Sequence, residues 1–208
     1  MSRRKRLISE EVKRSFDAEL DEITQVFGYL FVSGCLPICR KTIENHKFTA
    51  VVCCFDDFRY DYPDCVLENT TLAIDDTCDT NLSVHFQKIA DLIEKHRKNV
   101  PDGKVLVFCH RGASRSVSLI LAYLMIYHQK TLKEAFDYVQ SKRKVSCPNS
   151  GFFRQLINLE KQVKNISDEV CSVKMIRPFP GRPEIEVADI IWRKSLELLE
   201  DDDDDKVQ

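Results

Sequence analysis

A thiol and a guanidinium stand six positions apart in the middle of the chain. Cys109 and Arg115 enclose the sequence Cys-His-Arg-Gly-Ala-Ser-Arg, and Ser116 follows it. A largely apolar run, 104–108, precedes this segment, and a longer apolar run, 117–127, follows it. This order is typical of a strand, a tight loop and a helix. Such a loop can turn its backbone N–H groups around an anion, and the helix N-terminus adds further donors.

The chemistry that these residues could perform is attack on a phosphoryl group. Donors around Cys109 favour its thiolate, which is a strong nucleophile near neutral pH. Arg115 can hold two phosphoryl oxygens in a bidentate fork. Gly112 suits a loop whose backbone approaches an anion closely or adopts a positive φ. The residues predicted to bind the phosphoryl group are His110, Arg111, Gly112, Ala113, Ser114 and Arg115. Because these groups supply positioning and charge, no metal or other cofactor is expected.

The segment from Cys109 to Ser116 resembles the signature loop of the cysteine-dependent protein phosphatases. Within that superfamily, Ser114-Arg115-Ser116 is most similar to the dual-specificity branch. Residues 121–125 resemble the family's helix after the loop, and Arg143, residues 148–152 and Gln155-Leu156 resemble its later helix entry. The tail, residues 173–176, resembles that of the small atypical members. The resemblance extends over residues 23–192 and implies a dual-specificity phosphatase catalytic domain there.

The resemblance also implies roles for three residues outside the core of the loop. Asp76, at the end of an apolar stretch, matches the general acid that protonates the leaving oxygen and then activates water. Asp75 is the alternative. Ser116 resembles the hydroxyl that stabilises the departing thiolate, although it could also be a helix N-cap. Asn149 resembles an asparagine that braces the signature loop, and a cap or turn residue after Pro148 is the alternative.

One position departs from the family pattern. The family has His immediately before its nucleophile, whereas this chain has Phe108. That His orders the loop and activates the thiol, so Phe108 predicts a less reactive Cys109 with phosphate binding intact. His110 follows the nucleophile, and we expect its side chain to point outward rather than to compensate.

Length and composition fit one globular domain with a hydrophobic core. The chain has 208 residues, 43% of them hydrophobic, and a net charge of −2. Residues 200–205 form an unbroken acidic run; without it the 31 basic residues outnumber the acidic ones. A mildly basic body suits anionic substrates without indicating a nucleic-acid partner.

The cysteines and the chain ends predict the compartment. Nine cysteines at irregular spacings favour reduced thiols in a cytoplasmic protein. The basic patch Arg3 to Arg6 is followed by a polar sequence rather than an apolar leader, and it could act as a nuclear-import signal. The longest apolar run is about half of the ~20 residues that a membrane span needs.

Alternating strand and helix patterns predict the fold class and the domain limits. We expect an α/β three-layer sandwich, with a mainly parallel central sheet and helices on both faces. Residues 1–22 are expected to be a basic extension, partly helical or disordered, and 23–192 the catalytic domain. Residues 193–208 would hold the end of a C-terminal helix and a disordered acidic tail. The helices are predicted at 37–46, 83–98, 117–127, from Thr131 (capping box with Glu134), at 150–164 and at 185–199.

The sequence therefore predicts a phosphatase that hydrolyses phosphotyrosine and phosphoserine or phosphothreonine in proteins through a cysteinyl-phosphate. Its partners would be phosphorylated proteins, with kinases among them. A phosphoinositide or RNA 5′-phosphatase is one alternative, because His110 and Arg111 make the loop basic. A pseudophosphatase that only binds phosphorylated partners is the other alternative, motivated by Phe108.

Overall fold

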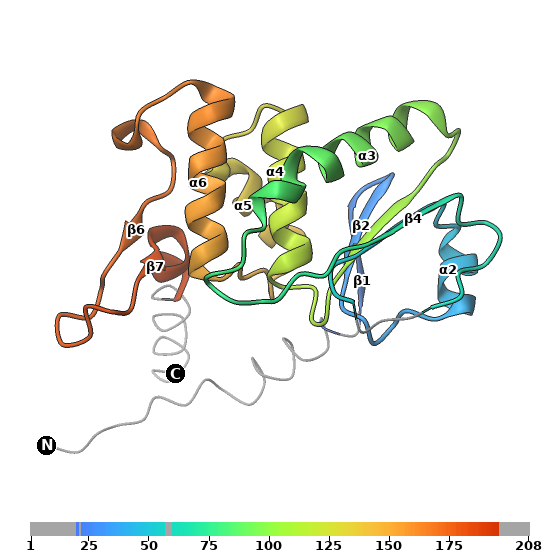
Figure 1. Ribbon diagram of the computed structural model, residues 1–208, viewed down its shortest axis with the longest axis horizontal. Helices are drawn as coiled ribbons and strands as arrows, with labels where there is room; N and C mark the ends of the chain where they lie inside the picture. Colours follow the sequence, from blue (N-terminus) through green and yellow to red (C-terminus); the bar gives the residue numbers. More distant parts are fainter. Residues whose placement is uncertain (1–19, 21, 57–59, 196–208) are drawn as a thin grey trace, which may run out of the picture.

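The main sheet has five strands in the order β1-β2-β5-β3-β4 (Figure 1). A computed structural model describes residues 20, 22–56 and 60–195 of the chain. Strands β2, β5, β3 and β4 run parallel, and β1 pairs antiparallel with β2 at one edge. The strands are β1 (Ile23–Phe27), β2 (Leu30–Ser33), β3 (Ala50–Cys53), β4 (Glu68–Thr71) and β5 (Val105–Phe108).

The three inner strands are buried at every position, since both faces of the sheet are covered. Strands buried on both faces have continuous apolar sequences, as in Val105–Phe108. The edge strand Glu68–Thr71 instead alternates between half-buried and exposed residues. The parallel strands β5 and β3 bring their carboxyl ends to the same edge of the sheet.

Helices cover both faces of the sheet, which confirms the predicted three-layer α/β sandwich. Figure 1 shows α3, α4, α5 and α6 gathered on one face and α2 on the other. Helix α4 is central, because residues 115–125 are all buried and α3, α5 and α6 pack against it. The helices are α2 (Arg40–His46), α3 (Phe86–Asn99), α4 (Arg115–Tyr127), α5 (Leu132–Lys142) and α6 (Ser150–Lys164), with short 3₁₀ turns at Ser83–His85 and Asp168–Val170.

Local signals in the sequence set the helix ends accurately where a cap is present. Thr131 caps α5 in a capping box with Glu134, as predicted. Asn149 caps α6, which spans the predicted range. Helix α2 begins later than predicted, at Arg40, because Ile38 forms a turn in which its N–H bonds the Cys35 carbonyl at 3.1 Å.

The C-terminal segment folds back beside α6, at the left of Figure 1. Strand β6 (Met175–Ile176) pairs antiparallel with β7 (Val187–Ala188), and residues 189–195 are helical. The predicted helix over 185–199 is therefore wrong at its start, because 187–188 pair with a strand earlier in the chain. The predicted basic extension and acidic tail lie outside the described residues, apart from Leu20 and Glu22.

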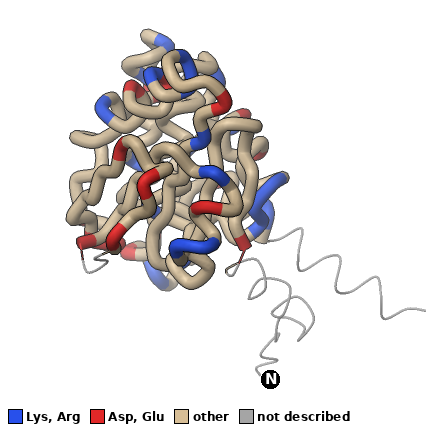
Figure 2. Tube along the Cα trace, turned by 90° about the vertical axis from the view of Figure 1, so that its right-hand side faces the viewer, with Lys and Arg blue, Asp and Glu red and all other residues tan. Residues whose placement is uncertain are grey.

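Charges of both signs are distributed over the molecule. Figure 2 shows Lys and Arg interspersed with Asp and Glu along the visible trace. In the part of the chain that the structure describes, no helix is long and apolar enough to cross a membrane.

Candidate active site

The signature segment lies between β5 and α4, in the predicted strand, loop and helix arrangement. Cys109 directly follows β5, and Arg115 is the first residue of α4. Both side chains are buried, with exposed fractions of 1% and 7%. The loop between them lies at the carboxyl edge of the parallel sheet, where ligands bind in open α/β sheets.

Four successive carbonyl groups of the loop, those of residues 110–113, are bonded on its outer side. Cys35 N–H bonds the first at 3.1 Å, and the side chain of Arg143 bonds the next two at 3.0 and 2.7 Å. Cys147 N–H bonds the fourth at 2.8 Å. In a trans peptide the C=O and the following N–H point in opposite directions. The N–H groups of residues 111–114 therefore face the inner side and form a cradle for an anion.

Arg143 is a site residue that the sequence analysis did not assign. It follows α5 and is fully buried. Besides the two loop carbonyls, it donates to the Glu22 carbonyl at 3.1 Å and to Thr24 Oγ1 at 2.9 Å. Its guanidinium thus joins the loop to β1. The sequence analysis named Arg143 only as part of the family resemblance, and nothing in the basic cluster 142–144 indicates a contact with the loop.

Gly112 has the positive φ predicted for it, 66°. A side chain there would also collide with β2, because a Cβ would lie 2.4 Å from the Ser33 carbonyl carbon. The close approach that requires glycine is therefore to the sheet, in addition to any approach to an anion.

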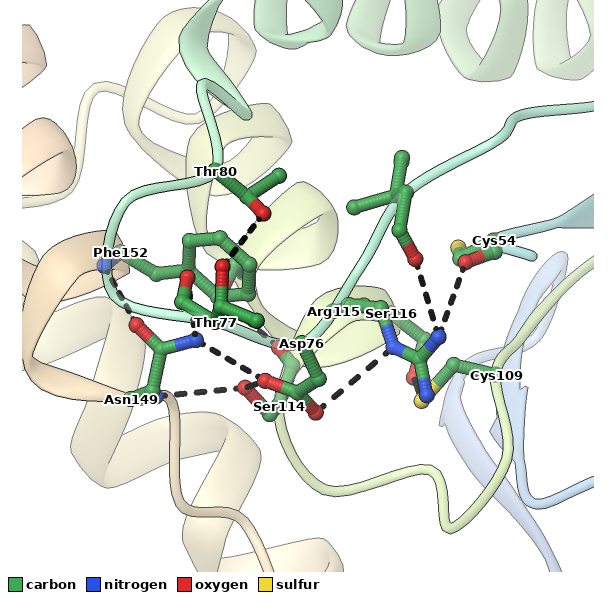
Figure 3. A network of polar contacts seen from close by, with 12 residues as sticks. Cys54, Asp76, Thr77, Thr80, Cys109, Ser114, Arg115, Ser116, Asn149 and Phe152 are labelled. Carbon is green, nitrogen blue, oxygen red and sulfur yellow. Dashed lines mark hydrogen bonds and ion pairs between the residues drawn. The ribbon is translucent and has the colours of Figure 1, made fainter.

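The sulfur of Cys109 has two polar contacts, one with the loop and one with the first turn of α4. Gly112 N–H donates to Sγ at 3.2 Å, and Ser116 Oγ, beside Cys109 in Figure 3, lies 3.2 Å from Sγ. These contacts hold the sulfur at the base of the loop. The neighbouring thiols differ, because burial raises the pKa of Cys53 to about 11 and also raises the pKa of Cys54. Both of these neighbouring thiols are therefore protonated at neutral pH.

Hydrogen bonds from Nη1 fix the Arg115 guanidinium, and the edge that carries Nε makes none of these bonds. Nη1 donates to the Ile74 carbonyl at 3.0 Å and to the Cys54 carbonyl at 3.5 Å. Nε lies 3.6 Å from Asp76 Oδ2 and donates no hydrogen bond among the described residues. A buried donor that makes no hydrogen bond is costly, so this edge is suited to bind oxygen atoms of a ligand.

Asp76 reaches the loop from the segment after β4, as Figure 3 shows. Its Oδ1 accepts from Ser114 Oγ at 2.7 Å and from Asn149 Nδ2 at 2.9 Å. Oδ2 is left to face Arg115, and the side chain is 35% exposed. Asp75, the alternative acid, is exposed and is not among the residues that line the cleft.

Asn149 combines the two roles that the sequence left open. Its Oδ1 accepts from Phe152 N–H at 2.9 Å and caps α6, while its own N–H donates to Ser114 Oγ at 3.2 Å. The Asp76 loop rests directly on this helix, because a Cβ on Gly151 would lie 2.0 Å from the Cys78 carbonyl oxygen.

Phe108, which replaces the family histidine, is fully buried beneath the loop. Its ring meets Phe55 edge-on, with centroids 6.0 Å apart. His110 is exposed and stacks on the other side of this cluster, with its ring centroid 4.1 Å from that of Phe55. An apolar contact therefore occupies the family histidine position, and Arg143 orders the loop from outside.

A cleft of about 580 Å³ opens over the loop. The predicted site residues that line it are Asp76, Cys109, His110, Arg111, Ala113, Ser114, Arg115 and Asn149. Ser116 lies beneath Cys109 rather than in the cleft wall. Lining residues that the sequence analysis missed include Gln140, Lys144, Ile191, Lys194 and Ser195.

Comparisons with known proteins agree with this geometry. The family model described as dual specificity phosphatase, catalytic domain, matches residues 29–162. Dual specificity protein phosphatase 1 of Arabidopsis thaliana is 36% identical over 133 residues, which cover 64% of this chain and 65% of that protein. Dual specificity protein phosphatase 14 of Bos taurus is 31% identical over 185 residues, covering 88% and 87%.

A solved structure is similar over most of its length. The human tyrosine phosphatase-like serine/threonine/tyrosine-interacting protein has a TM-score of 0.63 and 25% identity, covering 68% of this chain and 97% of that one. The chain spans less than two thirds of the first curated relatives that it matches, at 58% of a Caenorhabditis elegans protein and 65% of the Arabidopsis protein. With the family model matching more than half of its residues, the chain belongs to the dual specificity phosphatase family and carries the catalytic domain of that family.

Proposed function

We propose that this protein is a cysteine-dependent phosphatase that hydrolyses phosphotyrosine and phosphoserine or phosphothreonine in proteins. One observation supports this most directly. A single loop combines the Cys109 sulfur, inward-facing N–H groups and a buried Arg115 whose Nε donates no hydrogen bond within the described residues. This combination stabilises the three equatorial oxygens of a phosphoryl group during in-line transfer.

In the first step the Cys109 thiolate attacks phosphorus, and the S–P bond forms as the bond to the leaving oxygen breaks. Arg115 and the loop N–H groups hold the equatorial oxygens. Protonated Asp76 gives its proton to the leaving oxygen, so the dephosphorylated side chain departs neutral. The exposed position of Asp76 at the cleft permits this contact.

In the second step water attacks the cysteinyl-phosphate. Asp76, now ionised, accepts a proton from that water, and the S–P bond breaks to release inorganic phosphate. Ser116 Oγ, 3.2 Å from the sulfur, donates to the departing thiolate. The step regenerates both the thiolate and the protonated acid.

The lining of the cleft supports action on both aliphatic and aromatic phosphoesters. No Phe, Tyr or Trp is among the described residues that line it. Phe55, whose ring centroid lies 5.7 Å from the Arg115 guanidinium carbon, packs against His110 and Phe108 and does not line the cleft. A site without an aromatic clamp does not select a phenyl ring, so the shorter phosphoserine and phosphothreonine can also reach Cys109.

The first test is hydrolysis of p-nitrophenyl phosphate and of phosphopeptides. We expect turnover by the wild type, inhibition by vanadate, and loss of turnover in Cys109→Ser with binding retained. Asp76→Asn should reduce kcat by about 10²–10⁴-fold. The control is Cys39→Ser, which changes an exposed thiol at the start of α2 and should retain full activity. Equal activity in Cys109→Ser and the wild type would contradict the proposal.

Phe108 favours a second function, the binding of phosphorylated partners without turnover. An apolar ring supplies no hydrogen bond to the loop at the position of the family histidine. In that case phosphopeptides bind to the wild type without release of phosphate. Arg115→Lys, which removes the bidentate fork, then abolishes binding. Measured phosphate release above that of Cys109→Ser rejects this second function.

A further inference from the structure

The C-terminal segment forms one wall of the catalytic cleft. The family model ends at residue 162, yet Ile191, Lys194 and Ser195 line the cleft together with Cys109 and Arg115. This wall therefore comes from sequence that lies beyond the matched catalytic domain.

Several contacts hold this wall in place. Asp189 N–H donates to the Lys174 carbonyl at 2.8 Å, directly after the β6–β7 pair. Glu186 and Arg154 of α6 form an ion pair of 2.7 Å. Ala188 and Ile190 are buried in the main core, with exposed fractions of 2% and 5%. The helical segment 189–195 is thus a fixed part of the domain.

The Lys194 side chain connects this wall to α5 through contacts with Asp137 and Phe136. Its Nζ lies 3.0 Å from Asp137 Oδ1 and 5.4 Å from the centroid of the Phe136 ring. Asp137 also pairs with Lys133 at 2.6 Å. Two cations share one carboxylate here, so this cluster, which includes the cleft residue Lys194, keeps a net positive charge.

Basic residues outnumber acidic ones in the described lining of the cleft. Its described lining contains four basic residues, Arg111, Arg115, Lys144 and Lys194, and one acidic residue, Asp76. Asp76 faces Arg115. Arg111 and Lys144 are exposed and form no ion pair within the described residues. Arg111, Lys144 and Lys194 come from the signature loop, the α5–α6 connection and the C-terminal wall, so three separate segments contribute positive charge to the cleft.

We infer that this cleft selects phosphorylated peptide segments that carry acidic residues beside the phosphorylated one, and that Lys144 and Lys194 determine this preference. The inference rests on the proposed function of the same site. A phosphoryl group occupies only the cradle around Cys109, whereas the cleft of about 580 Å³ extends to the wall. An extended peptide places its flanking side chains several ångströms from the phosphate, where these lysines lie outside the cradle. Complementary charge then favours acidic side chains.

The test uses two phosphotyrosine peptides that differ only at the flanking positions, Glu and Asp in one and Ser and Gln in the other. The readout is the ratio of kcat/KM for the acidic peptide to kcat/KM for the neutral peptide. We expect a wild-type ratio of about 10 or more at low salt, falling with ionic strength. Lys194→Met and Lys144→Met should each reduce the ratio about 3-fold or more, and Lys194→Glu should reduce it further.

The matched control is Arg193→Met. Arg193 is the neighbour of Lys194, pairs with Asp189 and does not line the cleft. Its removal should leave the ratio unchanged. Lys144→Met keeps the test valid if Lys194 variants fail to fold, because Lys144 is exposed and has no ion pair in the described part of the chain.

A wild-type ratio near 1, or an equal decrease of the ratio in Arg193→Met and Lys194→Met, would overturn the inference. Faster turnover of a phosphoinositide than of the acidic peptide would also overturn it and assign the cationic cleft to a lipid headgroup. Failure of the proposed function is separate, because it appears as absent hydrolysis of p-nitrophenyl phosphate. The same ratio is then measured from the dissociation constants of the two peptides.

Discussion

The hydroxyl of Ser114 joins three separate segments of the chain. It donates to Asp76 Oδ1 at 2.7 Å and accepts from Asn149 N–H at 3.2 Å, while its own backbone belongs to the signature loop. The proposed acid, the loop and the start of α6 are therefore linked through one oxygen atom. Ser114 acts as a positioning residue for Asp76.

Ser114→Ala should impair proton donation more than nucleophilic attack. We expect kcat to fall about 10²-fold for phenyl phosphate, a poor leaving group, and less than about 10-fold for p-nitrophenyl phosphate. Ser118→Ala is the control, because Ser118 bonds the Ser114 carbonyl within α4 and not the acid. Steady-state kinetics over a series of aryl phosphates measures the difference. Equal losses across the series would assign Ser114 to loop structure alone.

At the level of elements, Arg143 connects the end of α5, the signature loop and the region before β1. Its four hydrogen bonds to Gly112, Arg111, Glu22 and Thr24 are made by a fully buried guanidinium. Hydrogen bonds from a charged donor each contribute about 1.5–3 kcal/mol. Arg143 therefore stabilises the loop in the conformation that turns its N–H groups inward.

We expect Arg143→Lys to lower both the stability of the fold and its affinity for oxyanions. An ammonium cannot replace the planar fork, so at least two of the bonds are lost. The free energy of unfolding in urea should fall by about 2–4 kcal/mol. The inhibition constant for vanadate should rise by an order of magnitude. Lys142→Met, at an exposed neighbour, should change neither quantity.

The strand, loop and helix around Cys109 could be predicted because their signals are local. An apolar run, a loop with Gly112 and a second apolar run lie within about 25 consecutive residues of sequence. The signals that predicted helix α6 and the cap of α5 were also local in the sequence. By contrast, β7 is a strand only because Val187–Ala188 pairs with Met175–Ile176. Helical periodicity in its own sequence gave no sign of that partner.

At the scale of the whole molecule, a second polar network lies away from the catalytic loop. Tyr123 in α4 donates to Glu94 Oε2 at 3.0 Å, and Tyr29 lies 2.9 Å from the Tyr123 hydroxyl. Arg97 forms a bidentate pair with Glu94 at 2.6 and 2.9 Å. Glu94 is 7% exposed. This network ties α3 and α4 to the beginning of β2, and it stabilises the C-terminal part of α4, away from the site at the start of that helix.

We expect Glu94 to make the free energy of unfolding decrease at acidic pH. The hydrogen bond from Arg97, with those from Lys98 and Tyr123, lowers the pKa of Glu94 to about 2 from an ordinary value of 4.5. A depressed carboxyl pKa stabilises the fold fully above about 4.5, and this contribution is lost as pH falls toward 2. Glu94→Gln should cost about 2–3 kcal/mol at pH 7 and flatten the stability profile below pH 4.5.

The control for this prediction is Glu44→Gln. Glu44 pairs with Arg40 at 3.1 Å on the surface of α2, where both side chains are about half exposed. Such pairs contribute little to stability. Urea unfolding between pH 2.5 and 7 compares the variants. A profile for Glu94→Gln parallel to that of the wild type would show that Glu94 does not cause the decrease.

Contacts between residues far apart in the sequence are the part of the site that could not be predicted from the sequence. Asp76 was assigned through a family resemblance, but the bond between Asp76 and Ser114 joins residues 38 positions apart. Ile191, Lys194 and Ser195 reach the cleft only because β6 and β7 reverse the chain. No periodicity or motif in residues 163–195 contains that information, since it depends on contacts with α5 and α6.

The Nε of Arg115 makes the stability of the fold sensitive to the binding of oxyanion ligands. Its nearest acceptor, Asp76 Oδ2, is 3.6 Å away and too far for a hydrogen bond. An oxyanion that accepts a hydrogen bond from this buried donor lowers the energy of the fold. Melting temperature should therefore rise in order of affinity across tungstate, phosphate and phosphorylated peptides. Screening by thermal shift can thus rank natural phosphoproteins before any turnover has been measured.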